Sequence, residues 1–306
     1  MLVESLRCFG GRFAQAPFIA VRPRFGGALE SPTLKSFKTN NVQLLDIRPN
    51  NPYAWYSFLN KPLTLMEVDK RATTKLIAWI DGDVLVARPP EELELSPDCD
   101  FVAVAPDKNI GTAGPDDPNE FYWREMCRIT DVDLDKLPWI TTEREKVRIR
   151  MYFNSGVFSF PRGIGFPRTY YELTKKLLDE KIAGQQSKLF FHEQSALGLA
   201  VQKMGLRWRA LSFDYNYSAG QKVDHHYVPT ELRSSRLIHY HSALYAPYWS
   251  KFIEYLKTEK PDLYDWLAPR GPLTADLPIT SRVVNWMTKK VRLRQSNQHL
   301  SQCRIV

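Results

Sequence analysis

Two aspartates separated by one glycine offer the clearest chemistry in this 306-residue chain. Asp81, Gly82 and Asp83 follow the β-prone run 77–80, and apolar sequence then resumes. Side chains at i and i+2 of an extended segment point the same way, so both carboxylates would lie on one face. Such oxygen ligands suit Mg²⁺ or Mn²⁺, and the glycine permits close approach to the backbone. Because Asp-Gly after a strand is also a common turn, this motif alone decides nothing.

A glycine inside an apolar strand is the second unusual feature. Asn154, Ser155 and Gly156 interrupt the hydrophobic run 151–160. A glycine at such a place marks either a β-bulge or a point where another group approaches the backbone closely. Asn154 is therefore either part of a structural bulge or a hydrogen-bond partner for a sugar hydroxyl.

Two polar pairs follow towards the end of the chain. Glu193 and Gln194 open an amphipathic helix, where acidic residues either stabilise the helix terminus or face a cleft. His239 and His241 stand at i and i+2 of an apolar strand. A pair of imidazoles on one face is a better candidate for a metal site than a single histidine, since neutral imidazole binds divalent metals well.

Strand-like and helix-like segments alternate along the chain, which predicts an α/β sandwich. We expect strands over residues 18–21, 42–47, 75–80, 100–105, 151–160, 208–213 and 236–241. We expect helices over residues 2–9, 53–66, 121–129, 168–182, 192–204 and 248–257. Pro62 must end or kink the second of these helices, and the charged stretch 131–148 is expected to be a surface insertion.

The composition is that of a folded globular protein with an excess of positive charge. Hydrophobic residues make up 43% of the chain, and the formal net charge is +8. This charge favours anionic partners such as nucleotide diphosphates, whereas the lack of a basic stripe or known nucleic-acid module argues against nucleic acid. Four scattered cysteines and the lack of an apolar run of about 18 residues indicate a cytoplasmic protein.

Four segments, taken in order, resemble the motifs of one glycosyltransferase family. They are residues 80–85, 153–157, 193–197 and 238–240. The family is that of glycogenin and the lipopolysaccharide galactosyltransferases, retaining enzymes of the GT-A fold. The resemblance implies a Rossmann-like sandwich with a mixed sheet flanked by helices over residues 1–260, followed by a basic extension over residues 261–306.

The resemblance also implies an activity. It implies transfer of a hexose from a nucleotide-diphosphate donor such as a UDP-sugar, with retained configuration, to a carbohydrate, lipid or protein acceptor. It implies that Mn²⁺ or Mg²⁺ is held by Asp81, Asp83 and His239, with His241 a competing ligand. It implies that Glu193 and Gln194 lie beneath the anomeric carbon. The residues implied to contact the donor are Lys61, Asp81, Gly82, Asn154, Ser155 and Gly156.

Departures from the family pattern keep two alternatives open. Glu193 stands where the family has an aspartate, and the stretch 242–249 lacks the lysine that follows the last motif. An inactive nucleotide-sugar-binding protein on the same fold is therefore one alternative. A dehalogenase-like phosphatase is another, but Leu85 stands where that class has Thr or Val, and two plausible strands precede Asp81.

The basic stretch 282–294 carries Trp286 among five Lys and Arg residues. A stretch of this kind can lie on an anionic membrane surface. The alternative is a fraying basic terminus.

The start of the chain gives one more expectation. Residues 2–9 resemble the helix that follows the first GT-A strand, and residues 18–21 resemble the second strand. We therefore expect the first strand to be missing from this chain. The sheet should then show a break between the strands that begin near Phe18 and Ile77.

Overall fold

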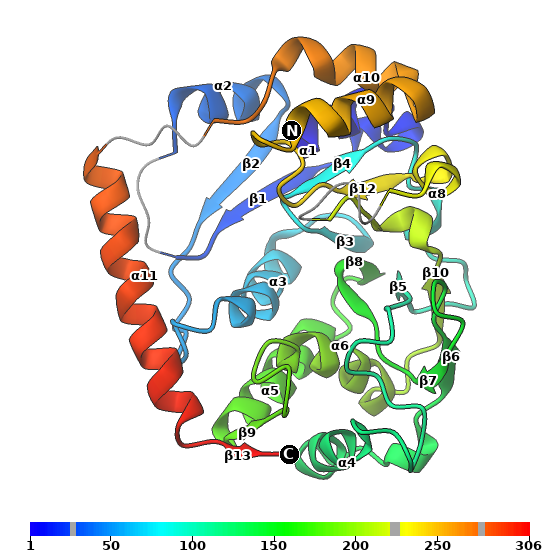
Figure 1. Cartoon of the computed structure of the whole chain (residues 1–306), viewed down its shortest axis with the longest axis vertical. Helices are drawn as coiled ribbons and strands as arrows, with labels where there is room; N and C mark the ends of the chain where they lie inside the picture. The colour runs from blue at the N-terminus through cyan, green and yellow to red at the C-terminus, as the bar shows by residue number, and fades with distance from the viewer. Residues whose placement is uncertain (25–28, 221–226, 275–278) are drawn as a thin grey trace.

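A four-stranded mixed sheet forms the centre of the computed structural model, which describes residues 1–24, 29–220, 227–274 and 279–306 (Figure 1). Its strand order is β10-β5-β8-β3, with β10 parallel to β5 and with β8 antiparallel to both β5 and β3. The strands are β3 (Leu76–Ile80), β5 (Phe101–Val104), β8 (Asn154–Pro161) and β10 (Trp208–Leu211).

Aromatic and aliphatic side chains bury this sheet under helices. Phe101, Phe158 and Phe160 are fully buried, and their rings pack with that of Phe166. Strands covered in this way read as continuous apolar runs, which is why their sequences show little alternation. The helices that share this core are α3 (Asn60–Arg71), α4 (Glu120–Thr130), α5 (Phe166–Asp179) and α6 (His192–Lys203).

A second, three-stranded sheet lies beside the first. It has the order β11-β12-β4 and consists of β4 (Val84–Val86), β11 (Tyr217–Ser218) and β12 (Leu237–His239). Leu85 and Ile238 on this sheet pack in one core cluster with Phe252, Leu256 and Leu263. The elements around it are α8 (Pro229–Ser234), α9 (Trp249–Glu259) and α10 (Pro261–Leu267), so this core continues past residue 260.

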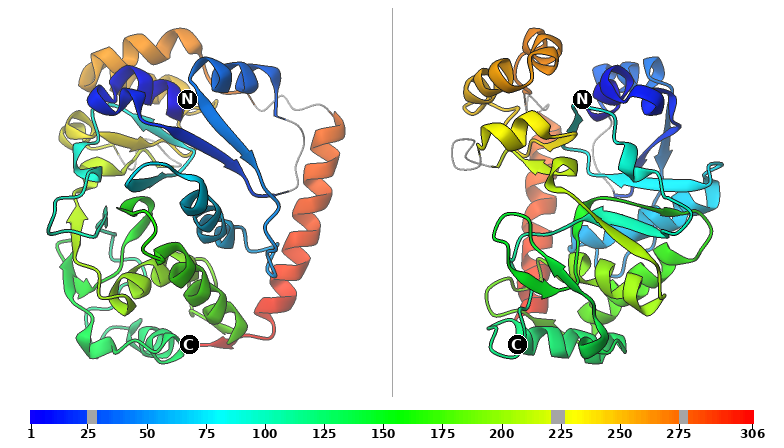
Figure 2. Two further views of the ribbon diagram at one scale, coloured as in Figure 1. Left: turned by 180° about the vertical axis from the view of Figure 1, so that it is seen from behind. Right: turned by 90° about the vertical axis from the view of Figure 1, so that its right-hand side faces the viewer.

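The N-terminal strands stand apart from both sheets. β1 (Phe18–Arg22) pairs in parallel with β2 (Val42–Asp46), and α1 (Leu2–Phe9) and α2 (Ser31–Thr39) flank them (Figure 2). Within the described residues, β1 has no strand neighbour other than β2, and β3 has none other than β8. The break expected between the Phe18 and Ile77 strands is therefore present.

Shorter elements complete the chain. Two small pairs form between β6 (Trp139–Thr141) and β7 (Arg148–Arg150), and between β9 (Ile182–Ala183) and β13 (Arg304–Ile305). The long helix α11 (Ile279–Leu300) precedes β13. Single 3₁₀ turns cover Gly11–Gln15, Ser57–Leu59, Glu91–Leu93, Leu134–Lys136, Phe213–Tyr215 and Ala268–Arg270. Among the described helices, none combines the length and apolarity needed to cross a membrane.

The mixed α/β architecture expected for the GT-A fold is confirmed. The seven expected strands are present, and every terminus lies within three residues of its expected position. The helix predicted over 53–66 is wrong, because α3 begins only at Asn60. Pro62 lies in its first turn, where a missing N–H costs nothing, so this proline starts the helix instead of ending it.

The prediction of a surface insertion over 131–148 is also wrong. Leu134, Leu137 and Ile140 are buried in the main core cluster, together with Ile149 just beyond the segment. The apolar residues are spaced too widely among charged ones to show a strand period. Ile140 and Ile149 are buried in the β6–β7 pair, and Leu134 and Leu137 are buried in and after the preceding 3₁₀ turn.

Ser5 links α1 to the edge of β4. Its hydroxyl donates to the Leu2 carbonyl at 2.9 Å and accepts the Val86 N–H at 2.9 Å. We expect Ser5→Ala to lower the free energy of unfolding by about 1–3 kcal/mol, because the buried Val86 N–H loses its acceptor. Ser235→Ala is the matched control, since this buried serine donates only to Leu232. Equal urea midpoints for the two variants would contradict this role.

Candidate active site

A β-bulge in β8 brings Asn154, Ser155 and Gly156 to the end of β3. Phe158 faces Ala103 of β5, but Asn154 faces the very next residue, Val104. The β-bulge, which was one of the two structures expected from the Asn-Ser-Gly sequence, is therefore present. On the other edge, the Asp81 N–H donates to the Gly156 carbonyl at 2.9 Å, which places Asp81 directly beside the bulge.

The Lys61 ammonium lies between the bulge and two carboxylates. Its Nζ donates to the Ser155 carbonyl at 2.7 Å and to Ser155 Oγ at 3.0 Å. Asp81 Oδ1 is 3.2 Å from Nζ, and Glu193 Oε1 is 3.7 Å away. Burial lowers the pKa of Lys61, but the charges of Asp81 and Glu193 outweigh it and raise this pKa above its ordinary value. The lysine therefore stays charged.

Glu193 is buried at the first turn of α6. Ser155 Oγ donates to its Oε2 at 3.1 Å, and its own N–H donates to the Tyr56 hydroxyl at 3.1 Å. Burial raises the pKa of Glu193 to about 7, with Asp81 adding to the rise while Lys61 and Ser155 oppose it. Glu193 Oε1 has no hydrogen-bond partner among the described residues. This carboxyl therefore exchanges a proton near neutral pH.

Asp83, His239 and His241 form a second group. One ligand atom from each lies within 4.8 Å of the others. His239 Nε2 is 2.9 Å from Asp83 Oδ1, and His241 Nδ1 is 3.9 Å from Asp83 Oδ2. The pairing of Val84 with His239 in β4 and β12 brings them together. β12 ends at His239, and His241 follows with a left-handed backbone, φ 46°.

Asn216 and Ser218 support these two histidines. Asn216 Oδ1 is 3.2 Å from His239 Nδ1, and Ser218 Oγ is 3.0 Å from His241 Nε2. Partners of this kind orient metal-ligating imidazoles. The sequence analysis identified neither residue. The signal that the sequence offers is the alternation of Asn216 and Ser218 with Tyr215 and Tyr217.

Asn216 also joins the two groups. Its Nδ2 donates to Asn154 Oδ1 at 3.0 Å, and the same oxygen accepts the Gly156 N–H at 2.8 Å. A methyl group at Gly156 would lie 3.0 Å from Asn154 and 3.4 Å from both Asn216 and Asp81. Glycine at this position therefore leaves space where the two groups meet.

The donor set of the second group fits a divalent cation. Burial raises the pKa of Asp83, but the hydrogen bond and charge of His239 outweigh it, and the net pKa is lowered. The carboxylate is therefore ionised and offers oxygen beside two imidazole nitrogens. Of the predicted metal ligands, Asp83 and His239 lie together, and the competing ligand His241 lies beside them. Asp81 Oδ1 instead accepts from Trp79 Nε1 at 2.6 Å and faces Lys61.

Gln194 and Gly82 are the two remaining predicted site residues, and neither contacts Lys61 in a hydrogen bond or ion pair between described residues. The half-buried Gln194 side chain hydrogen-bonds Tyr152, whereas the Glu193 side chain faces Lys61. A Cβ at Gly82 would meet no atom within 4 Å, so this glycine faces open space beside both aspartates. The side chains of Glu193 and Gln194, neighbours in the chain, therefore have different partners, and their predicted catalytic role stays a prediction.

Comparison with known proteins decides the family. A family model described as the Rhodobacterales glycosyltransferase domain matches residues 1–205. This chain belongs to that family. The match contains Lys61, Asp81, Asp83 and Glu193, whereas His239 lies beyond it. The expected resemblance is thus confirmed at the level of a glycosyltransferase. Its assignment to the glycogenin and lipopolysaccharide galactosyltransferase family stays a prediction.

Solved structures similar to this chain are also glycosyltransferases. The apo structure of the bifunctional glycosyltransferase WbbM has a TM-score of 0.45 and 12% identity, covering 86% of this chain and 47% of that one. This chain thus spans about half the WbbM chain. A glycosyltransferase involved in glycosylation of the major capsid of PBCV-1 has a TM-score of 0.39 and 11% identity, covering 73% and 92%. Apo mouse xyloside xylosyltransferase 1 has a TM-score of 0.38 and 11% identity, covering 78% and 90%. The search of curated proteins gave no match.

The raised pKa of Glu193 predicts how stability depends on pH. Between its ordinary value of 4.5 and about 7, the folded state holds this proton more tightly than the unfolded state does. The contribution of Glu193 to stability must therefore fall as pH rises through this window. Glu193→Gln removes the effect, so we expect the variant to gain on the order of 1–3 kcal/mol over the wild type between pH 5 and pH 8. Urea unfolding at both pH values measures this gain, and parallel curves for the two proteins would refute the assignment.

Proposed function

We propose that this chain is a metal-dependent glycosyltransferase that uses a nucleotide-diphosphate sugar, such as a UDP-hexose, as donor. The observation that carries the proposal is the cluster of Asp83, His239 and His241 beside the carboxylates of Asp81 and Glu193. The group of Asp83, His239 and His241 suits a cation that binds the diphosphate, and the carboxylates of Asp81 and Glu193 suit the sugar. Membership of a glycosyltransferase family supports this division of roles.

Asp83, His239 and His241 would hold the cation. One carboxylate and two imidazoles favour Mn²⁺ over Mg²⁺, because Mg²⁺ prefers oxygen ligands throughout. When bound, such an ion supplies positive charge that stabilises the departing diphosphate. Asn216 and Ser218 keep the two imidazole rings in place through their second nitrogens.

Lys61 and Glu193 would act on the sugar side of the donor. Glu193 in its ionised form stabilises positive charge that develops at the anomeric carbon. Lys61 contributes by holding Asp81 and Ser155 in fixed positions, since its N–H groups are directed at these two residues. Open space beside Gly82 lets a donor approach the backbone between the two aspartates.

Retention of the anomeric configuration is part of the proposal. It rests on the motif resemblance, in which Glu193 and Gln194 lie beneath the reacting carbon. NMR of the first-formed product tests it, since a β-linked product from an α-linked donor would refute retention. The acceptor is a carbohydrate, lipid or protein.

An inactive nucleotide-sugar-binding protein is the second candidate. One observation favours it: the Lys61 ammonium is already surrounded by Ser155 and Asp81, so it is not free to bind a phosphate. Donor binding without turnover in the presence of Mn²⁺ would support this candidate. Membership of the glycosyltransferase family argues against the dehalogenase-like phosphatase.

Removal of one cation ligand tests the main proposal. We expect Asp83→Ala to lower Mn²⁺-dependent hydrolysis of a UDP-sugar by at least about 100-fold, because the cation loses its charged ligand. Asn216→Ala, which leaves all three ligands in place, should cost about 10–100-fold.

Asp116→Ala is the matched control, since this aspartate is exposed on a loop and is not one of the clustered ligands. It should retain full activity. Unchanged turnover in Asp83→Ala, or full activity of the wild type after treatment with EDTA, would rule out the proposed metal role.

A further inference from the structure

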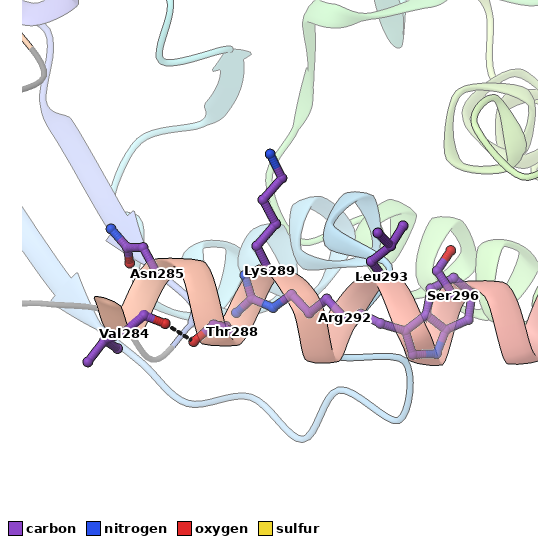
Figure 3. Close-up of a pocket in the computed structure, with 8 residues that line it drawn as sticks. Val284, Asn285, Thr288, Lys289, Arg292, Leu293 and Ser296 are labelled. Carbon is purple, nitrogen blue, oxygen red and sulfur yellow. Dashed lines mark hydrogen bonds between the residues drawn. The ribbon is translucent and has the colours of Figure 1, made fainter. Parts of the chain in front are cut away.

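The helix α11 runs along the outside of the molecule (Figures 1 and 2). A pocket of about 500 Å³ separates part of it from Trp55. Figure 3 shows Asn285, Lys289 and Ser296 on the pocket side of the helix. The helix therefore has one face towards the body of the protein and an opposite face towards solvent.

The face towards the body is mainly polar, with Val284 and Leu293 as the apolar residues that line the pocket. From Ser281 onward, the least exposed positions recur at helical spacing, and before Leu300 they are Ser281, Thr288, Arg292, Ser296 and His299. A surface helix usually turns its apolar stripe inward to bury it. In α11, by contrast, the least exposed positions are polar over most of the helix.

The face towards solvent carries four other large apolar side chains. Val283, Met287 and Val291 follow one another at i, i+4 and i+8, and they are 47%, 56% and 56% exposed. Trp286, 56% exposed, lies beside them. An exposed apolar row of this kind marks an interaction surface.

Basic residues are interleaved with this row. Lys290 and Arg294 lie on the same face by helical spacing, and the Lys290 Nζ is 4.1 Å from the centre of the Trp286 ring. Residues 279–306 contain six Lys and Arg residues and no Asp or Glu. Two copies of this helix would therefore repel each other, whereas an anionic surface would attract it.

The C-terminal end of the helix is fixed to the protein body. β13 pairs with β9, and the Val306 N–H donates to the Ala183 carbonyl at 2.9 Å. The His299 ring centre is 4.8 Å from that of Trp55. The tail is thus an anchored helix, not the fraying terminus considered from the sequence.

We propose that the outward face of α11 binds an anionic lipid bilayer and lies in its headgroup region. Val283, Met287 and Val291 enter the apolar boundary, and Trp286 takes the interfacial position that its ring favours. Lys290 and Arg294 extend their charged ends to the lipid phosphates. The proposal does not depend on the proposed enzyme function.

Co-sedimentation of the full chain with lipid vesicles tests this proposal. We expect binding to vesicles of phosphatidylglycerol and phosphatidylcholine to be at least tenfold tighter than binding to phosphatidylcholine alone, and to weaken with salt. Trp286→Ser/Met287→Ser/Val291→Ser should weaken binding at least tenfold. The control Thr288→Ser/Ser296→Ala changes the inward face and should bind as the wild type does.

A charge-reversal pair keeps the test valid if the serine variant loses its helix. Lys290→Glu/Arg294→Glu should weaken binding at least tenfold, while Arg128→Glu/Lys136→Glu, an equal change of charge on exposed residues of α4 and the following turn, should have less than a twofold effect. Equal losses of vesicle binding in the two charge-reversal pairs, or no binding of the wild type to anionic vesicles, would overturn the proposal. It would also be overturned if the wild type formed a dimer in solution and the serine substitutions dissociated that dimer.

Discussion

The buried ammonium of Lys61 is the interaction on which the candidate site depends. It comes from α3 and faces Asp81 after β3, Ser155 in β8 and Glu193 in α6, so one charge holds four elements in position. Two carboxylates share this single cation, and an unpaired buried charge is costly. Burial raises the pKa of Glu193 to about 7, and the negative charge of Asp81 adds to this rise although Lys61 opposes it.

The pairing of β4 with β12 imposes the second constraint. It ties Asp83 to His239 through the backbone, since the Tyr240 N–H donates to the Asp83 carbonyl at 2.9 Å. The two aspartates of one short motif therefore face different partners: Asp81 turns to Lys61, and Asp83 turns to the histidines. This division places a group suited to a cation next to a carboxyl that titrates near neutral pH.

Local sequence patterns predicted most of the fold and part of the site. The β8 bulge, the helix that starts at His192 and the strands around Asp81 follow from residue type and spacing within a few positions. The alternation of Asn216 and Ser218 with two tyrosines is visible in the sequence, but it assigns no role to either residue until β11 pairs with β12. The effect of Pro62 is hard to predict from the sequence for a similar reason, since it depends on which turn of α3 the proline occupies.

The central claim is that Asp83, His239 and His241 bind the divalent cation, and pulsed EPR of Mn²⁺ bound to the full chain tests it most directly. With ¹⁵N-labelled histidine, the account predicts nitrogen hyperfine coupling from two imidazoles, and loss of that coupling in His239→Ala/His241→Ala. Bound Mn²⁺ that shows no histidine coupling, or coupling that persists in the double variant, would contradict the account.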